Sequence, residues 1–175
     1  KQWQNLLGYV ENGGGFLPIH CASWCFGNEA GFDQLVGGRF AHHKTGVFRA
    51  RTILAGHAAV KNVSEFEAWD ETYVHKNHNP KDRVVLQVRE VAGPKDNITQ
   101  PEPWTWIRTQ GKGRVFYTAA GHDERVWKRD EFHALIKKGI LWAIGDGRRA
   151  TYEHFLASRP TLNYEKRDNI PNYEK

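Results

Sequence analysis

Apolar residues recur at helical spacing near both ends of the folded part of the chain. The first run predicts an amphipathic helix that ends at the glycines of positions 13–15, where left-handed backbone is tolerated. A wider apolar stripe predicts a long helix over residues 130–144 that covers one face of a sheet. A shorter helix is expected over residues 28–36. The apolar positions of the first helix are Trp3, Leu6, Leu7 and Val10.

Between these helices, short apolar or alternating runs predict strands. Residues 57–75 suggest a loop with a short turn and an extended end, and residues 92–103 suggest a second loop. Because helix and strand signals alternate, we expect an α/β layered domain with a mostly parallel sheet. The expected strands are residues 16–19, 46–55, 83–90, 105–110 and 113–120.

Length and charge then limit the class of protein. A chain of 175 residues with 39% hydrophobic content suits one globular domain. The net charge of +5 comes from scattered basic residues without a nucleic-acid motif, so nucleic-acid binding is not expected. No apolar run approaches the roughly 20 residues of a membrane span. Since the chain opens on Lys1 inside a helical pattern and has no methionine, we expect a piece of a longer protein.

Two histidines lie just beyond the ends of predicted strands. His20 follows residues 16–19, and His122 follows residues 113–120. Ligands of such sheets bind at the carboxyl ends of the strands, so neighbouring strands would open both imidazoles onto one crevice. Neutral imidazole can accept a proton or bind a metal. The two cysteines, Cys21 and Cys25, lack a second ligand pair and are expected to be packed thiols.

Several segments resemble the trehalose-utilisation (ThuA-like) family, a branch of the class I glutamine-amidotransferase-like, flavodoxin-type fold. The resemblance covers roughly residues 3–145. It implies a three-layer sandwich over residues 1–146 with a mostly parallel sheet, and an earlier βαβ portion that is missing here. The segments are "ENGGGFLPIH", "FDQLVGGRFAHH", "FEAWDETYVH" and "WIRTQGKGRVFYTAAGHDERVW", followed by "FHALIKKGILWAIGD".

The resemblance also bears on the chemistry. In the amidotransferase-like fold a catalytic cysteine occupies the turn after a strand, with a His-x-Glu pair later in the chain. His20 holds that turn position here and Cys21 lies one residue beyond, so we do not expect a glutamine amidotransferase. The pair corresponds to His122 and Glu124, and Glu124 is expected to orient His122. The resemblance adds Glu71, which makes His20, His122 and Glu71 the expected catalytic residues.

Aromatic residues supply the expected substrate wall, although each has a simpler alternative. The resemblance favours Tyr73 in the pocket, whereas Trp24, Trp104 and His57 are equally compatible with ordinary packing. Asp70 or Glu71 can also simply cap a turn. The remaining loop histidines are expected to be solvated; they are His42, His43, His75 and His78.

Three functions stay open. The family association implies an enzyme that acts on carbohydrate, such as a disaccharide or keto-sugar. The same His20, His122 and Glu71 could bind zinc or another divalent ion in a metal-dependent hydrolase or isomerase. The third alternative is a non-catalytic binding domain of a larger haem or sugar-dehydrogenase-like protein.

The tail over residues 147–175 reads as a linker or docking tail. It resembles segments that join ThuA-like domains to cytochrome c or sugar-dehydrogenase-like modules in secreted bacterial proteins. That resemblance favours a periplasmic or secreted location over a cytoplasmic one. The oligomeric state stays open.

Overall fold

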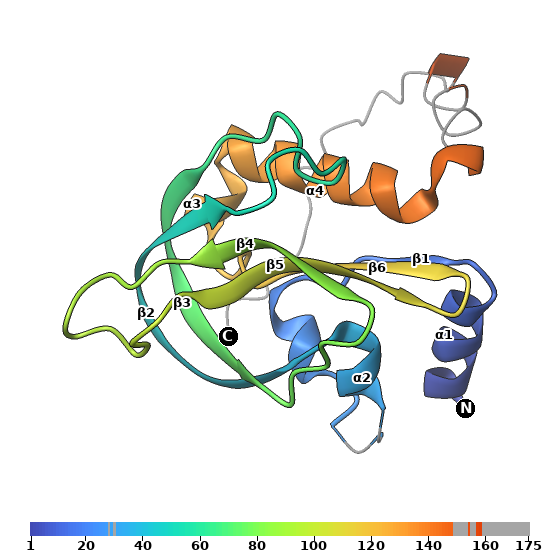
Figure 1. The fold of residues 1–175 in the computed structure, drawn as a ribbon, viewed down its shortest axis with the longest axis horizontal. Coiled ribbons are helices and arrows are strands. Elements are labelled where there is room, and N and C mark those ends of the chain that lie inside the picture. The colour runs from blue at the N-terminus through green and yellow to red at the C-terminus, as the bar shows by residue number, and fades with distance from the viewer. Residues whose placement is uncertain (28, 30, 149–153, 155–156, 159–175) are drawn as a thin grey trace, which may run out of the picture.

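A six-stranded sheet with helices on both faces forms the body of this computed structural model, which describes residues 1–27, 29, 31–148, 154 and 157–158 (Figure 1). The helices are α1 (Gln2–Glu11), the 3₁₀ turn η1 (His20–Trp24), α2 (Phe32–Val36), α3 (Glu124–Trp127) and α4 (Asp130–Ile144). The strands are β1 (Gly15–Phe16), β2 (Arg39–Thr52), β3 (Phe66–Lys76), β4 (Arg83–Arg89), β5 (Glu102–Gln110) and β6 (Gly113–Thr118).

The sheet is mostly antiparallel, so the prediction of a mostly parallel sheet was wrong. Its strand order is β1-β6-β5-β4-β2-β3, and within the described residues only β1 and β6 are parallel neighbours. The cause is the length of the connections. β5 and β6 are joined through Gly111 and Lys112, and a turn this short cannot make the crossover of a dozen or more residues that parallel strands need.

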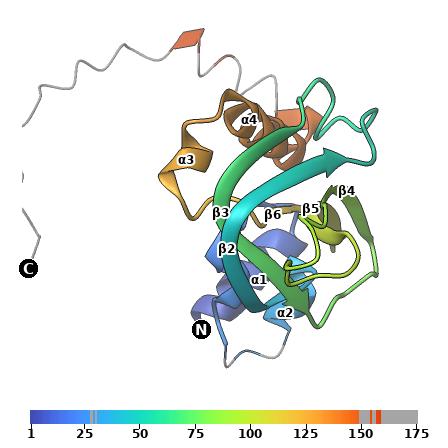
Figure 2. The same cartoon turned by 90° about the vertical axis from the view of Figure 1, so that its left-hand side faces the viewer.

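The strands β2 and β3 form a long curled pair at one edge of the sheet (Figure 2). β2 begins at Arg39 rather than Gly46, and β3 occupies the end of the segment for which the sequence suggested a loop. Ala41 is an extra residue in this pair, because Phe40 lies opposite His75 while His42 lies opposite Val74. Such a β-bulge changes which side chains face inward.

The helix predicted over residues 130–144 is confirmed as α4, and it packs on β6. Phe132, Leu135 and Gly139 face the sheet and are buried. The approach is close enough that a Cβ on Gly139 would lie 2.8 Å from the ring of Phe116. The helices α1 and α2 lie on the opposite side of the sheet (Figure 1). None of the helices in the described part of the chain has the length and apolarity to cross a bilayer.

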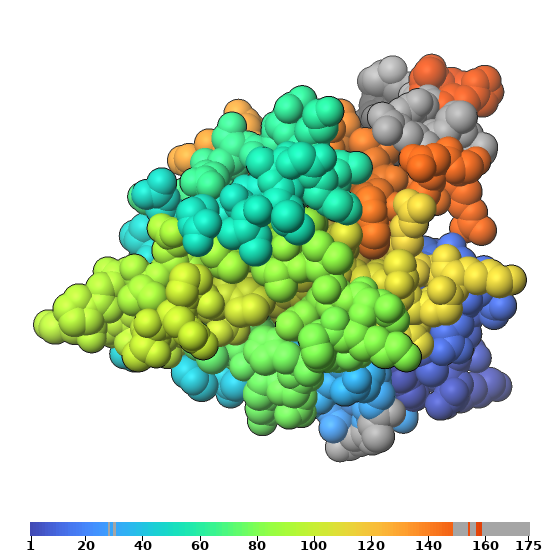
Figure 3. Space-filling model, viewed as in Figure 1, coloured from blue at the N-terminus to red at the C-terminus, as the bar shows by residue number. Residues whose placement is uncertain are grey.

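The single parallel pair determines where the candidate site forms. β1 and β6 run side by side, and Ile19 forms a further parallel bridge to Thr118. The residues that follow β1 and β6 therefore leave the sheet side by side, at the carboxyl ends of these two strands. On another side of the molecule the segment after β4 projects from the body (Figure 3). The predicted tail lies almost entirely outside the described residues.

Candidate functional site

His20 occupies a strained turn directly after the parallel bridge. Its φ of 47° lies in the left-handed region, which is uncommon for a residue other than glycine. The side chain is buried, and its Nδ1 lies 2.7 Å from the carbonyl oxygen of Ala119. The backbone carbonyl of His20 accepts a hydrogen bond from Ser23 Oγ at 3.1 Å, and Tyr117 Oη also lies 3.1 Å from this oxygen. Hydrogen bonds at both ends of the residue thus fix the direction of the imidazole.

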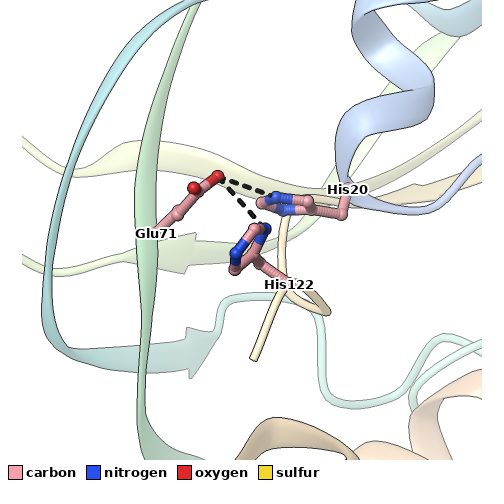
Figure 4. Close-up of side chains that lie close together, drawn as sticks. All are labelled: His20, Glu71 and His122. Carbon is pink, nitrogen blue, oxygen red and sulfur yellow. Dashed lines mark hydrogen bonds and ion pairs between the residues drawn. The ribbon is translucent and has the colours of Figure 1, made fainter. Parts of the chain in front are cut away.

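Glu71 on β3 meets two imidazoles with one oxygen. Its Oε2 lies 3.1 Å from Nε2 of His20 and 3.5 Å from Nδ1 of His122 (Figure 4). One nitrogen or oxygen from each of the three side chains falls within 4.8 Å of the others. The exposed fraction rises from 4% at His20 through 16% at Glu71 to 54% at His122. The cluster therefore opens to solvent on the side of His122.

Asp70 fixes the backbone segment that contains His122. Its fully buried carboxylate accepts hydrogen bonds from the backbone N–H groups of Gly121 at 2.8 Å and Asp123 at 3.0 Å. A longer contact of 3.4 Å reaches the N–H of His122 itself. For Asp70 the turn-capping alternative is therefore correct, whereas the carboxylate of its neighbour Glu71 faces the imidazoles.

Tyr73 lies two residues from Glu71 on the same side of β3. Its ring lies over the His20 imidazole, with a centroid separation of 4.0 Å and a tilt of 34°. Burial, followed by the charge of Glu71, raises the pKa of the Tyr73 hydroxyl. The phenol therefore stays protonated near neutral pH and can act as a hydrogen-bond donor beside the cluster.

Trp24 extends this aromatic surface toward solvent. Its ring meets Phe40 edge-on at 5.5 Å between centroids, and Phe40 in turn lies 4.4 Å from Tyr73. The guanidinium of Arg39 lies 4.6 Å from the centroid of Trp24. About half of Trp24 is exposed. A row of rings therefore leads from the buried His20 to the surface.

Three predicted site residues lie elsewhere. Trp104 is fully buried and packs on Phe48, because its strand contributes that side chain to the core. His57 lies in the turns after β2, where its Nδ1 accepts a hydrogen bond from the N–H of Ala59. Glu124 is exposed and pairs with Lys128 at 3.1 Å one helical turn away, so it does not orient His122.

Sequence reasoning missed His43, for which it predicted a solvated loop. It lies on β2 with its Nε2 3.6 Å from Oε1 of Glu71, the oxygen that does not face the other two histidines. Its Nδ1 is 3.3 Å from the carbonyl oxygen of Lys44. Recognition of the strand before Gly46 would have shown His43 opposite Tyr73, its partner in the sheet register.

His75, Glu102 and Tyr117 form a second buried polar cluster, which contacts η1 through Tyr117. The prediction that His75 is a solvated loop residue was therefore wrong. His75 Nδ1 lies 3.2 Å from Glu102 Oε1, and Tyr117 Oη lies 2.9 Å from His75 Nε2. Burial lowers the pKa of His75 against the opposing effect of Glu102, and burial raises the pKa of Tyr117. With a neutral ring, Glu102 accepts the Nδ1 hydrogen and Tyr117 donates to Nε2.

The cysteines also differ from expectation, since both thiols are free and exposed rather than packed. The Sγ of Cys25 lies 3.8 Å from the carbonyl oxygen of Cys21. His20, and not Cys21, has the left-handed backbone at the turn after the strand.

Comparison with models of protein families matches residues 1–143 to a family described as ThuA, trehalose utilisation. No curated protein sequence matches this chain. Among solved structures, a ThuA-like protein from Bacteroides uniformis is 22% identical with a TM-score of 0.67, over 80% of this chain and 62% of that one. A ThuA-like protein from Parabacteroides merdae is 17% identical with a TM-score of 0.64, over 81% of this chain and 64% of that one.

A β-galactosidase from Rahnella sp. R3 shares the fold more distantly. It is 16% identical with a TM-score of 0.57, and 79% of this chain covers only 20% of that enzyme. At these identities the likenesses show a common fold. The present chain spans less than two thirds of the length of the two ThuA-like structures.

Proposed function

Because this chain belongs to the trehalose utilisation (ThuA) family, we propose that His20, Glu71 and His122 form the catalytic centre of an enzyme that acts on carbohydrate. The observation that carries the proposal is their convergence: residues from three distant segments bring two imidazoles to one carboxylate oxygen. Titratable side chains gathered around one point are typical of catalytic sites.

The exposure of each group suggests its task. His122 is the open member and is placed to meet a hydroxyl or carbonyl group of a bound sugar. His20 is buried and fixed by Ala119, so it faces Glu71 and does not reach solvent. Imidazole and carboxylate groups are suited to proton transfer at a sugar hydroxyl or beside a keto group.

The aromatic row supplies a surface for the sugar ring. Tyr73, Phe40 and Trp24 lie in sequence from the cluster outward, and the apolar face of a sugar stacks on such rings. The protonated Tyr73 hydroxyl adds a hydrogen-bond donor at the inner end. In this proposal Tyr73 and Trp24 keep the substrate-binding role that the sequence suggested.

The test is conversion of disaccharides by the purified chain, followed by NMR. Trehalose and an oxidised keto-disaccharide are incubated with the parent protein and with His122→Ala, a substitution at an exposed side chain. We expect turnover by the parent and a loss of about 100-fold or more in the variant, in line with the loss of a general acid or base. The control is His133→Ala, at an exposed position of α4, which should behave as the parent.

Two results would contradict the proposal. Equal turnover by His122→Ala and the parent would remove the cluster from catalysis. Binding of the sugars without any conversion would instead support the non-catalytic carbohydrate-binding alternative.

A further inference from the structure

His20 faces the carboxylate of Glu71 with the ring nitrogen that is not bonded to the carbonyl of Ala119. A carbonyl oxygen can only accept, so the Nδ1 that faces Ala119 carries the hydrogen. In a neutral ring Nε2 then presents its lone pair toward Oε2 of Glu71, 3.1 Å away. Two acceptors facing each other at this distance need a cation between them, which is either a proton on Nε2 that makes the ring an imidazolium or a metal ion. A metal-binding histidine has the same arrangement, with its second nitrogen donating to a backbone carbonyl.

The two distances from Glu71 to the imidazoles also fit the ligands of one small cation. Two ligands of a tetrahedral zinc ion, each about 2.0–2.1 Å from it, are about 3.3 Å apart. The observed separations from Glu71 Oε2 are 3.1 Å to His20 and 3.5 Å to His122. Two histidines and one glutamate form a known set for a catalytic zinc ion that keeps one position open.

His43 approaches the carboxylate from the other side, and unlike the ligand His20 it must carry a hydrogen on Nε2 in order to hold Oε1 of Glu71. Its Nδ1 faces the carbonyl oxygen of Lys44, and its Nε2 lies toward Oε1 of Glu71. The bulge at Ala41 makes this possible, because it places Phe40 and His43 on the same side of β2 although they are three residues apart. His43 thus approaches the oxygen that the other two imidazoles leave free.

We propose that His20, Glu71 and His122 bind one divalent metal ion, with zinc as the first candidate, and that His43 is a positioning residue for Glu71. The contact at Oε1 keeps the carboxylate turned so that Oε2 alone points at the ion. Metal binding does not depend on the substrate. Its use in catalysis rests on the function proposed above, and it would place the ion, rather than the ring of His122, at the oxygen of the sugar. A zinc ion there would polarise a carbonyl oxygen or activate a water molecule.

The test begins with metal binding by the whole chain after removal of metals with a chelator. Zinc affinity is measured by competition with a coloured chelator, and cobalt is added to read the ligand set by visible absorption. We expect one equivalent of either ion for the parent. His122→Ala should weaken zinc binding by about 100-fold or more, since it removes one of three ligands from an exposed position. Unchanged zinc affinity in His122→Ala, or no binding by the parent, would overturn the site.

The role of His43 is tested separately. His43→Ala should weaken zinc binding by about 10-fold to 100-fold with the stoichiometry unchanged, as expected for a residue that holds a ligand. His43→Gln should recover part of the affinity, because its amide can donate to Oε1. The neighbouring His42→Ala, which lies opposite Val74 rather than Tyr73, is the matched control and should bind as the parent.

Thermal melts of the metal-free proteins should coincide for His43→Ala, His43→Gln and the parent, which excludes a general structural effect. Parent-like affinity in His43→Ala, or the same loss in His42→Ala, would overturn the positioning role.

The sugar assay separates this inference from the proposed function. Full turnover by metal-free protein would overturn the catalytic use of the metal and leave the carbohydrate function standing. One bound zinc per chain without any sugar conversion would leave the metal site standing and contradict the carbohydrate function.

Discussion

Asp70 and Gly121 are joined by a 2.8 Å hydrogen bond from the N–H that follows β6 to a buried carboxylate on β3. The same carboxylate also receives the N–H of Asp123. Asp70 and Glu71 are adjacent in sequence, yet one holds the backbone of the loop and the other meets the ring that the loop carries. The position of His122 relative to Glu71 therefore depends on one stretch of β3.

Asp70→Asn should destabilise the protein and loosen the site together. The amide keeps one acceptor oxygen but brings an NH₂ group toward backbone donors, so we expect a loss of about 1–3 kcal/mol in the free energy of unfolding. Zinc affinity should fall as well, because His122 is no longer held. Urea unfolding and the zinc competition assay measure both effects, and Asp146→Asn, at an exposed position after α4, is the control. A stable Asp70→Asn with parent affinity would show that the loop is fixed by other contacts.

Tyr117→Phe should destabilise the protein by removing a buried hydroxyl that contacts the backbone of His20. The hydroxyl contacts the carbonyl oxygen of His20, Ser23 Oγ and His75 Nε2, all within the buried interior. Its loss leaves buried polar atoms without a partner and should lower the free energy of unfolding by about 1–3 kcal/mol. Tyr9→Phe removes an exposed hydroxyl with one long contact of 3.4 Å to Gly15, and should stay within about 0.5 kcal/mol. Equal stability changes in the two variants would contradict this account of the network.

Replacement by alanine should change the stability of the protein in opposite directions at two helical glycines. At Gly8 in α1 an added Cβ would have no atom within 4 Å, so Gly8→Ala should stabilise by about 0.5–1 kcal/mol through helix propensity. At Gly139 the same methyl would lie 2.8 Å from Phe116, so Gly139→Ala should destabilise despite that propensity. Thermal unfolding of both variants provides the comparison. Stabilisation of Gly139→Ala would show that α4 does not pack on β6 as closely as described.

Stability should fall as the pH drops below about 6.5, in part because of His75. Burial lowers its pKa below the ordinary 6.5, with Glu102 opposing the shift and with His78 and Arg83 reinforcing it. The unfolded chain therefore binds the proton more readily, so the contribution of the neutral ring is complete above pH 6.5 and is lost as the pH falls. Urea unfolding of the parent between pH 7.5 and 5 should show this decline. His75→Gln should flatten it relative to the exposed control His133→Gln, and an unchanged slope would remove His75 as a cause.

The sequence was sufficient to predict the helices α1 and α4 and the meeting of His20 with His122. These depend on local periodicity and on two strands that end in histidines. The direction of the other strands was not recovered, although the short Gly111–Lys112 connection already required an antiparallel pair.

The remaining errors come from contacts between distant segments. The sequence is equally compatible with Trp104 as a pocket residue and as a core residue. Its packing on Phe48 depends on which strands are neighbours in the sheet. The direction of the His43 side chain depends on the bulge at Ala41. That bulge results from pairing with β3 and is not evident from the neighbouring residues in the sequence. Glu124 is near His122 in sequence, but the start of α3 turns it toward Lys128.

Anomalous diffraction at the zinc absorption edge, from crystals of the zinc-loaded chain, tests the central claim most directly. The account predicts one peak about 2.0–2.2 Å from Nε2 of His20, Oε2 of Glu71 and Nδ1 of His122, and no peak there in His122→Ala crystals. A zinc-loaded parent crystal without a peak at these three atoms, or with zinc only at other surface histidines or the free cysteines, would contradict it.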